Sequence, residues 1–573
     1  MNRVFHGISA SPGIVVGPVR LLRWEVPEVP HRIIDDDQID AEIARFRTAV
    51  KGATDRVQQV RERAEQHAGS DEALLNEVES YIRQNLDAEK AFDVVMLEWR
   101  QKFARSAAPM LRERVGDLTD VHIRVLSMLM QLPDHDPVDV PKGTNAILVT
   151  HDLTPSLTIQ LDREAIAGIA TDSGTRTSHV AILARSLGIP AVVGLRDATS
   201  RLRGGEPAVL DASSGLLVID PSPNELDAFR SRAVAQALSD AELALLTDVE
   251  AVTTDGVHIT LRANVDLPEE AETAARSGAD GVGLMRTEFL VVGRATMPDE
   301  EEQYRAYRRV VEAFEGRPVI VRTFDIGGDK LPIGGYPTEP NPFLGWRAIR
   351  MCLDSPELFK VQLRALLRAA MHGDVRIMLP LIVSVDEVRA ARQLLDEAAA
   401  ELTAAGVPFR RQVPLGVMME TPGAAVAADT FAGDVAFFSI GTNDLVQYTL
   451  AVDRGNVNLA QRFTPLHPAI LRLIRRIVDV ADAQGIDVAV CGEMASQPLM
   501  AFALIGLGVR ELSVNPRAVS TTKRLVRGIS TALAIEAASA ALASRTAPDA
   551  ERELRFRLVA AMGNGALAGE GAA

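Results

Sequence analysis

Residues 468–494, PAILRLIRRIVDVADAQGIDVAVCGEM, join a segment with helical spacing to a short apolar run that resembles a buried strand. Seven further β-rich runs lie between Gly256 and Asn515: HITLRANV, GVGLMRT, VIVRTFDI, RIMLPLIVS, LGVMMET, FFSIGTND and RELSVN. Helix-patterned segments separate them, such as 270–277, 348–371 and 385–404. Eight strand–helix units in a stretch of this size predict a (β/α)₈ barrel, with an open doubly wound sheet as the alternative.

Reactive side chains follow the C-terminal ends of these runs. They are Arg286, Arg322 with Asp325, Glu420, Asn443 with Asp444, and Cys491 with Glu493. Enzymes with this fold keep their sites at that face of the barrel. A lone arginine or glutamate is more often a surface charge or half of a salt bridge, but repeated placement on one face predicts an active site.

The residue types at these strand ends suit one reaction. Glu420 and Asp444 supply hard carboxylate oxygens, which Mg²⁺ prefers. Arg286, Arg322 and Arg454 can bind phosphate and carboxylate groups in bidentate fashion, so they suit a small phosphorylated acid. Phosphoryl transfer requires mainly positioning and charge neutralisation from the protein.

Cys491 admits two interpretations. A cysteine in a folded chain is most often buried and inert, and no metal-ligand spacing surrounds this one. Its place at a strand end, beside the arginines and carboxylates, favours a general acid. The other cysteine, Cys352, lies in an ordinary helical run and is not a candidate partner.

In the N-terminal half, residues 171–194, TDSGTRTSHVAILARSLGIPAVVG, place His179 between a Gly/Thr/Ser-rich turn and a helical pattern. With Thr177 or Ser178 as N-cap, His179 falls in the first turn of the helix. The free backbone N–H groups and the helix dipole would stabilise a phosphoryl group there and keep the imidazole neutral. A capping or core histidine is the usual explanation for such a residue, but the barrel's phosphoryl-donor site favours an acceptor.

The 573-residue chain is long enough for several domains. Strand-like runs before and after a charged, helical region suggest an α/β domain with an inserted subdomain of three or four helices. We expect an α/β phosphohistidine domain of residues 1–34 and 133–221, a helical subdomain of 35–132, a helical linker of 222–251, the barrel of 252–545, and a frayed tail of 546–573.

Charge and cysteine content limit the partners and the compartment. Lys and Arg number 61 against 77 Asp and Glu, a net charge of −16, which argues against nucleic acid or an anionic membrane as the main partner. Only two cysteines, no cationic apolar leader and no long uncharged apolar run predict a protein of the reducing cytoplasm without a membrane span.

Long motifs in a fixed order also carry a resemblance to a known family. The run 171–194 resembles the phosphohistidine motif of the phosphoenolpyruvate (PEP)-utilising enzymes. The later runs resemble successive motifs of the Enzyme I family of the bacterial sugar phosphotransferase system: GVGLMRTEFL, RTFDIGGDK, NPFLGWRAIR, VMMETPGAA, FFSIGTNDLVQYTLAVDRGN and VAVCGEMAS. The resemblance extends from GISASPGIVVG to the last predicted barrel strand.

The resemblance implies transfer of the phosphoryl group of PEP to a histidine of the chain and then to the phosphocarrier protein HPr, which starts sugar uptake. By position it implies a phospho-accepting His179 with Thr158 near its ring, substrate contacts from Arg286, Arg322, Asn443, Asp444 and Arg454, Mg²⁺ ligands Glu420 and Asp444, and a proton donor to the enolate, Cys491. It further implies that the helical insertion docks HPr, that the barrel forms a homodimer, and that the histidine domain swings about a hinge at 221–251.

One residue departs from the family pattern, and three related kinds of protein are alternatives. Gly174 is followed by Thr175 where the family commonly has a second glycine, and a β-branched residue is strained there if the turn needs positive φ. A pyruvate, phosphate dikinase or PEP synthase would share the histidine and barrel but needs a nucleotide-binding domain, for which we expect no room before GISASPGIVVG. A nitrogen-type paralogue would normally carry a sensory domain, and a silent regulatory paralogue would have lost residues such as Cys491 or Glu420.

Overall fold

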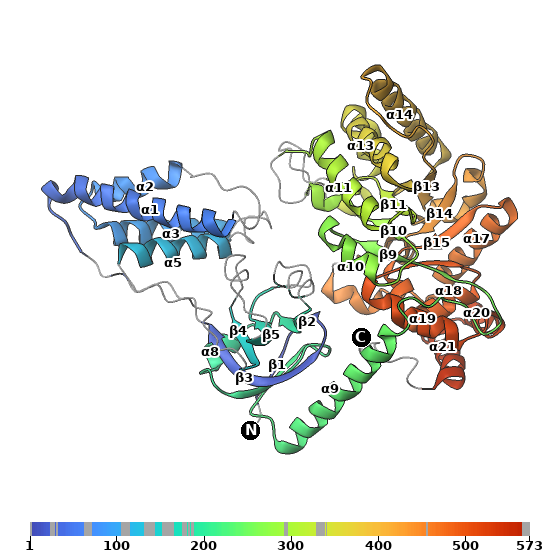
Figure 1. The fold of residues 1–573 in the computed structure, drawn as a ribbon, viewed down its shortest axis with the longest axis horizontal. Coiled ribbons are helices and arrows are strands. Elements are labelled where there is room, and N and C mark those ends of the chain that lie inside the picture. Colours follow the sequence, from blue (N-terminus) through green and yellow to red (C-terminus); the bar gives the residue numbers. More distant parts are fainter. Residues whose placement is uncertain are drawn as a thin grey trace. The chain divides into compact units, whose positions relative to one another are not determined.

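The computed structural model describes residues 3–22, 29, 32–61, 72–104, 115–130, 144–151, 165–174, 180, 184, 188–291, 296–327, 339, 341–453 and 456–563. The chain forms two compact units, Met1–Leu238 and Ser239–Ala573. The division falls within α9 (Pro223–Ala244), close to the predicted linker helix. Each unit is described by itself (Figure 1).

An eight-stranded sheet forms the α/β part of the first unit. Its spatial order is β1 (Arg3–His6), β8 (Leu216–Ile219), β7 (Pro207–Asp211), β3 (Ile14–Leu22), β4 (Ala146–Thr150), β5 (Ile166–Thr171), β6 (Ala191–Val193) and β2 (Ile8–Ser11). Strands β3 to β6 are parallel and the outer pairs are antiparallel. Leu148 of β4 belongs to one apolar core and its neighbours Ile147 and Val149 to another, so both faces of this continuous apolar strand are covered. A short helix, α8 (Ala198–Arg201), follows β6.

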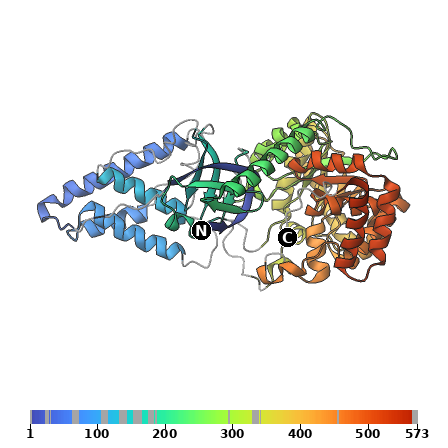
Figure 2. The same ribbon diagram turned by 90° about the horizontal axis from the view of Figure 1, so that it is seen from below.

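The helical insertion lies between β3 and β4 in the sequence. Its described helices are α1 (Ile39–Arg61), α2 (Glu72–Ile82), α3 (Ala88–Ala104) and α5 (Val115–Leu129), which pack side by side (Figures 1 and 2). Phe46, Ile82, Phe92 and Leu126 are fully buried between them. The predicted α/β domain, with strands on both sides of a helical insertion, is therefore confirmed.

The second unit contains a closed parallel barrel. Its strands are β9 (Thr260–Val265), β10 (Val282–Met285), β11 (Val319–Arg322), β12 (Val375–Leu379), β13 (Leu415–Met418), β14 (Phe437–Ile440), β15 (Asp487–Val490) and β16 (Glu511–Val514). Each strand pairs with the next, and β16 pairs with β9. The eight predicted runs are the eight strands, so the barrel is confirmed and the open sheet is excluded.

Helices surround the barrel. They are α10 (Ala271–Arg276), α11 (Glu300–Ala313), α12 (Ile349–Asp354), α13 (Pro356–Ala369), α14 (Val385–Ala404), α15 (Pro422–Val426), α16 (Thr442–Leu450), α17 (Pro468–Gln484), α18 (Pro498–Gly506), α19 (Val519–Gly528), α20 (Thr531–Ala543) and α21 (Ala547–Met562). The helix expected over 348–371 breaks at Ser355, because Pro356 disfavours helical backbone in the residue before it. Among the described residues, no single helix is long and apolar enough to span a membrane, and one sharply bent pair, Pro516–Gly528 with Thr531–Ala543, meets that test jointly.

The prediction of a frayed tail after about Arg545 is wrong as far as Met562, because these residues form a helix, α21. Helix α21 begins with Thr546 as its N-cap, whose side chain accepts a hydrogen bond from the backbone N–H of Asp549. Ala550, Leu554 and Leu558 are buried and pack the helix against α20 and α18. The charged composition of this segment concealed a stripe of apolar residues at helical spacing.

Candidate active site

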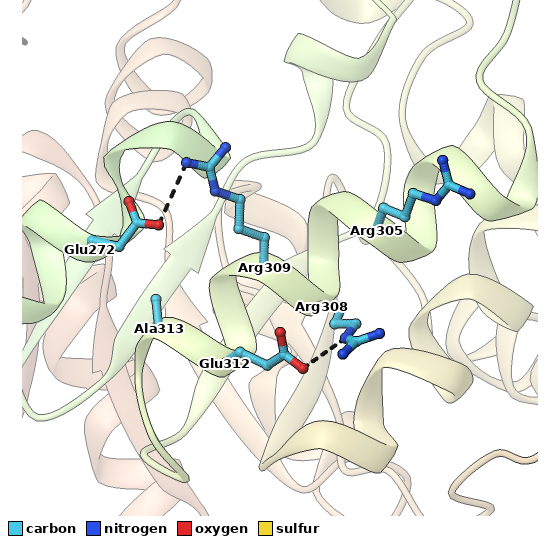
Figure 3. Close-up of a pocket in the computed structure, with 6 residues that line it drawn as sticks. All are labelled: Glu272, Arg305, Arg308, Arg309, Glu312 and Ala313. Carbon is cyan, nitrogen blue, oxygen red and sulfur yellow. Dashed lines mark hydrogen bonds and ion pairs between the residues drawn. The ribbon is translucent and has the colours of Figure 1, made fainter.

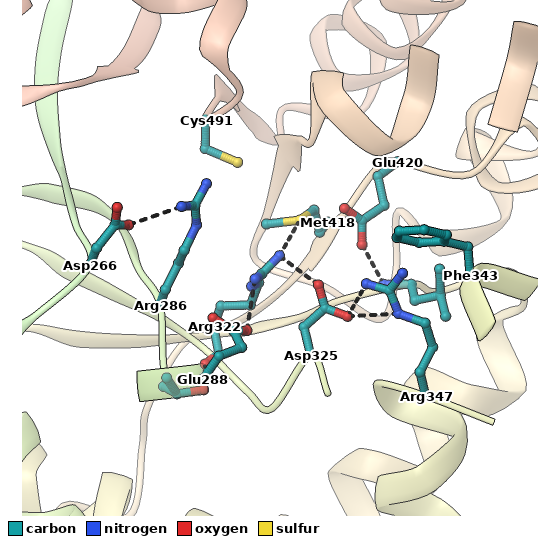
Figure 4. Close-up of polar contacts among 12 residues, drawn as sticks. Asp266, Arg286, Glu288, Arg322, Asp325, Phe343, Arg347, Met418, Glu420 and Cys491 are labelled. Atoms are coloured by element: carbon teal, nitrogen blue, oxygen red, sulfur yellow. Dashed lines mark hydrogen bonds and ion pairs between the residues drawn. The ribbon is translucent and has the colours of Figure 1, made fainter. Parts of the chain in front are cut away.

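Side chains predicted at the strand ends lie together at one mouth of the barrel, and Figure 4 shows five of them: Arg286, Arg322, Asp325, Glu420 and Cys491. Arg286 follows β10, Arg322 ends β11, Glu420 lies two residues after β13, and Cys491 follows β15. Asn443 and Asp444 lie in the first turn of α16, after β14. The C-terminal ends of parallel strands meet at one end of a barrel, which explains how residues so far apart in sequence come together.

Arg322 is buried between two carboxylates. Its Nη2 lies 2.7 Å from Glu288 Oε1 and its Nη1 lies 2.9 Å from Asp325 Oδ2. The hydroxyl of Thr287 donates to the Arg322 carbonyl at 3.1 Å. Burial alone would lower the pKa of Arg322, but the charges of Glu288 and Asp325 outweigh it and hold the pKa above its ordinary value. The guanidinium is therefore charged and fixed in place.

Asp325 also holds a second buried arginine, Arg347, which the sequence analysis missed. Arg347 Nη2 and Nε donate to Asp325 Oδ1 at 2.5 and 3.2 Å. Burial lowers the pKa of Arg347, and Asp325 more than compensates. Arg347 lies inside the NPFLGWRAIR motif but in a loop before α12, so no strand end marked it.

Glu420 and Asp444 form a pair of buried carboxylates. Glu420 Oε1 accepts a 2.6 Å hydrogen bond from the backbone N–H of Leu381, a residue held at a φ of 55°. Glu420 Oε2 and Asp444 Oδ1 are buried and have no hydrogen-bond partner among the described residues. Burial and the charge of Asp444 raise the pKa of Glu420 well above its usual range. Such a pair is destabilising unless a cation or proton neutralises it.

These oxygens suit a divalent cation. Hard cations prefer carboxylate oxygens, and Mg²⁺ commonly uses one or two of them and completes its shell with water and substrate. Within the described ranges, no cluster of three or more His, Cys, Asp or Glu side chains could hold a metal ion by itself. Glu420 and Asp444 therefore fit as two carboxylate ligands of such a cation.

Cys491 lies inside the barrel mouth. It is packed among Leu284, Ile320, Met418 and Phe437, and its Sγ lies 3.7 Å from the Ile440 carbonyl oxygen. Burial raises the pKa of the Cys491 thiol to about 11. The sulfur thus carries its proton at neutral pH, which suits a proton donor and argues against a thiolate nucleophile.

Arg286 and Asn443 also lie at the mouth. Arg286 Nη1 pairs with Asp266 Oδ1 at 3.1 Å, and its side chain is 39% exposed, so it is accessible to a ligand. The Asn443 side-chain oxygen accepts from the Glu493 backbone N–H at 3.4 Å. His179, Thr158, Thr175 and Arg454 lie outside the described residues. Their expected roles stay predictions.

A hollow of about 480 Å³ lies elsewhere, on the outer surface of α10 and α11 (Figure 3). It is lined by Glu272, Arg305, Arg308, Arg309, Glu312 and Ala313. Each of its arginines already pairs with a glutamate, as Arg308 does with Glu312 at 2.7 Å. Exposed pairs of this kind contribute little energy, and the hollow is separate from the barrel mouth.

Sequence profiles of one family cover most of the chain. The PEP-utilising enzyme N-terminal, mobile and PEP-binding domains match residues 6–114, 142–215 and 240–531. This chain belongs to the family of PEP-utilising enzymes. The PEP-binding domain of the family coincides with the barrel and its mouth.

Relatives in this family match over nearly the full length. The phosphoenolpyruvate-protein phosphotransferase of Geobacillus stearothermophilus is 41% identical over 534 residues, which are 90% of this chain and 92% of that one. The protein of the same name from Haemophilus influenzae is 40% identical over 565 residues, 96% of this chain and 98% of that one. A solution NMR structure of an Enzyme I protein is 29% identical and covers 41% of this chain and 99% of that one, with a TM-score of 0.32.

Proposed function

We propose that this PEP-utilising enzyme is a phosphoenolpyruvate-protein phosphotransferase, which moves the phosphoryl group of PEP to His179 and then to a histidine of HPr. One observation supports this function above all: the fixed guanidinium groups of Arg322 and Arg347 share a mouth with the buried carboxylates Glu420 and Asp444. The arginines suit an anionic phosphorylated acid, and the carboxylates suit a metal that neutralises it. Two long relatives carry this name.

PEP carries a phosphate and a carboxylate. We assign the phosphate to Arg286 and Arg322, with Asn443 and Arg454 as further contacts. Glu420 and Asp444 would hold Mg²⁺, which supplies charge neutralisation to the phosphoryl oxygens when bound. Glu288 and Asp325 already orient the Arg322 side chain. Binding of the phosphate therefore costs little conformational entropy at Arg322.

The first step breaks the bond between phosphorus and the enol oxygen. A neutral imidazole nitrogen of His179 attacks phosphorus in line, and the electron pair of the breaking bond stays on pyruvate enolate. The thiol of Cys491 gives its proton to the enolate carbon, and solvent later returns a proton to the sulfur. In the second step a histidine of HPr attacks the phosphorus and leaves His179 neutral. Thr158 is assigned a supporting place near the His179 ring.

The helical insertion, with α1, α2, α3 and α5, is the surface we assign to HPr. We also propose that the protein acts in the cytoplasm as a homodimer that forms through its barrel. These three assignments rest on the resemblance of the motifs to Enzyme I. Cross-linking of HPr to the insertion, and sedimentation of the full chain, test the first and the last.

Incubation with ³²P-labelled PEP and Mg²⁺, without nucleotide, tests the function. We expect an acid-labile, base-stable label on the protein and one pyruvate formed for each phosphoryl group bound. Label that the protein passes to pyrophosphate and AMP, to form labelled ATP, and not to HPr would instead show a dikinase. No label on the protein would show a chain that has lost catalysis.

A further inference from the structure

Tyr448 occupies a junction at the edge of the barrel mouth. It lies one turn after Asp444 on α16, and its hydroxyl donates to the Phe343 carbonyl at 2.5 Å. The same oxygen lies 3.5 Å from Arg347 Nη1. Burial raises the pKa of Tyr448 to about 12, so the phenol keeps the proton that it donates. The hydroxyl thus connects α16 to the loop of residues 341–347.

The loop of residues 341–347 places Arg347 at the mouth, and the backbone of the residue that follows is strained. Ala348, the next residue, has φ 53° and ψ −130°, a conformation costly for any residue with a side chain. Its N–H donates to the Ile326 carbonyl at 3.0 Å, and Arg347 forms a bridge with Gly327. A Cβ on Gly327 would lie 2.5 Å from that of Arg347, so only glycine allows this approach. Strained backbone of this kind persists where surrounding contacts enforce it.

Two sets of contacts hold the end of the Arg347 side chain. Asp325 ties it to Arg322, because one carboxylate accepts from both guanidinium groups. On the other side, the Phe343 ring centre lies 5.6 Å from the guanidinium carbon, and Tyr448 holds the Phe343 backbone. Asp325 thus fixes the positions of Arg322 and Arg347 relative to each other. Tyr448 fixes the position of Arg347 relative to α16, the helix that carries Asn443 and Asp444.

We propose that Tyr448 is a positioning residue for PEP: its hydroxyl fixes the loop of residues 341–347 against α16, so that Arg347, a buried guanidinium that we take to face the anionic substrate, keeps its place relative to Asn443 and Asp444. This inference rests on the proposed function and deepens it. Tyr448 itself does not touch the substrate. Its removal leaves the pairing of Arg347 with Asp325 in place but frees the loop from α16, so it weakens the binding of PEP more than it slows the chemical step.

The variant Tyr448→Phe, made in the full chain, tests this role. Tyr304→Phe is the matched control, because it also removes a hydroxyl, one that bonds to His372 Nε2 at 2.8 Å. Tyr304 lies on α11 and belongs to no part of the mouth. With Mg²⁺ and HPr present, we expect Tyr448→Phe to raise the KM for PEP about tenfold, the value of one net hydrogen bond, and to change kcat less than about twofold. Tyr304→Phe should change neither.

An unchanged KM in Tyr448→Phe, or a fall in kcat without a rise in KM, would overturn the proposal. So would an unfolding temperature lowered well below that of Tyr304→Phe, because the role of the hydroxyl would then be structural. Failure of the proposed function looks different: the wild-type chain itself would take no phosphoryl group from PEP.

Discussion

Replacing Glu420 by glutamine should stabilise the chain without Mg²⁺ and abolish its stabilisation by Mg²⁺. The side chain is 2% exposed, and its Oε2 has no hydrogen-bond partner among the described residues. Glutamine keeps the size and the oxygen that accepts from Leu381, but it removes the charge that faces Asp444. The metal-free protein therefore loses an electrostatic cost, and the metal loses a ligand.

The stabilisation of the metal-free protein by Glu420→Gln and the stabilisation of the wild type by Mg²⁺ are comparable in size. Removal of the charge from a carboxylate with one buried, unpaired oxygen stabilises by roughly 1–3 kcal/mol. For the wild type, Mg²⁺ at a hundred times its Kd stabilises by about 2.7 kcal/mol. For a unit the size of residues 239–573, that energy raises the unfolding temperature by about 4 °C.

The pH dependence has a defined sign. The folded-state pKa of Glu420 is raised, so its contribution to stability is fully present below the unfolded pKa and is lost as pH rises through the raised value. The metal-free wild type should lose this stability on going to neutral pH, and Glu420→Gln should not.

Scanning calorimetry of the full chain, with and without Mg²⁺ across this pH range, measures both effects. Glu357→Gln is the control, because that side chain is 84% exposed and its partner Lys360 keeps a second ion pair with Glu401 at 2.6 Å. A Glu420→Gln variant that is no more stable than wild type without metal, and still gains stability from Mg²⁺, would refute the assignment of this carboxylate.

Three further predictions concern Cys491 and its neighbour. Cys491→Ala should slow pyruvate formation from PEP by about 10²–10⁴-fold, yet leave phosphoryl exchange between phospho-HPr and the protein intact; equal loss of both reactions would argue against a proton donor. Because the thiol pKa is about 11, the protonated form predominates below that pH, and alkylation by iodoacetamide at pH 8 should be far slower than for free cysteine; equal rates would contradict this. Gly492→Ala should lower the unfolding temperature and reduce kcat/KM, because its Cβ would lie 1.7 Å from Thr442 Oγ1 at the start of α16. Gly433→Ala should do neither, because the space around Gly433 is open. Equal behaviour of the two variants would contradict this prediction.

The barrel could be predicted from sequence because the same pattern repeats eight times. Each strand is a short apolar run, and parallel strands place their C-terminal ends together whatever their distance in sequence. This rule alone predicts that Arg322, Glu420, Asp444 and Cys491 lie at one mouth of the barrel, without knowledge of individual side-chain contacts.

The pairing of side chains within the mouth could not be predicted in this way. Asp325 forms ion pairs with both Arg322 and Arg347. The Tyr448 hydroxyl donates to the carbonyl of Phe343, more than a hundred residues earlier in the sequence. Such contacts depend on loop conformation, including the strained backbone at Ala348, for which no periodic pattern exists. The break at Ser355, by contrast, can be predicted from sequence, because Pro356 disfavours helical backbone in the residue before it.

We propose that His179 carries the phosphoryl group from PEP to HPr. The most direct test compares His179→Ala with His151→Ala after incubation with ³²P-labelled PEP and Mg²⁺. His151 is a suitable control because it lies at the end of β4 with its side chain 76% exposed. We predict that His151→Ala takes up label and passes it to HPr and that His179→Ala takes up none; label retained by His179→Ala would show that another residue accepts the phosphoryl group.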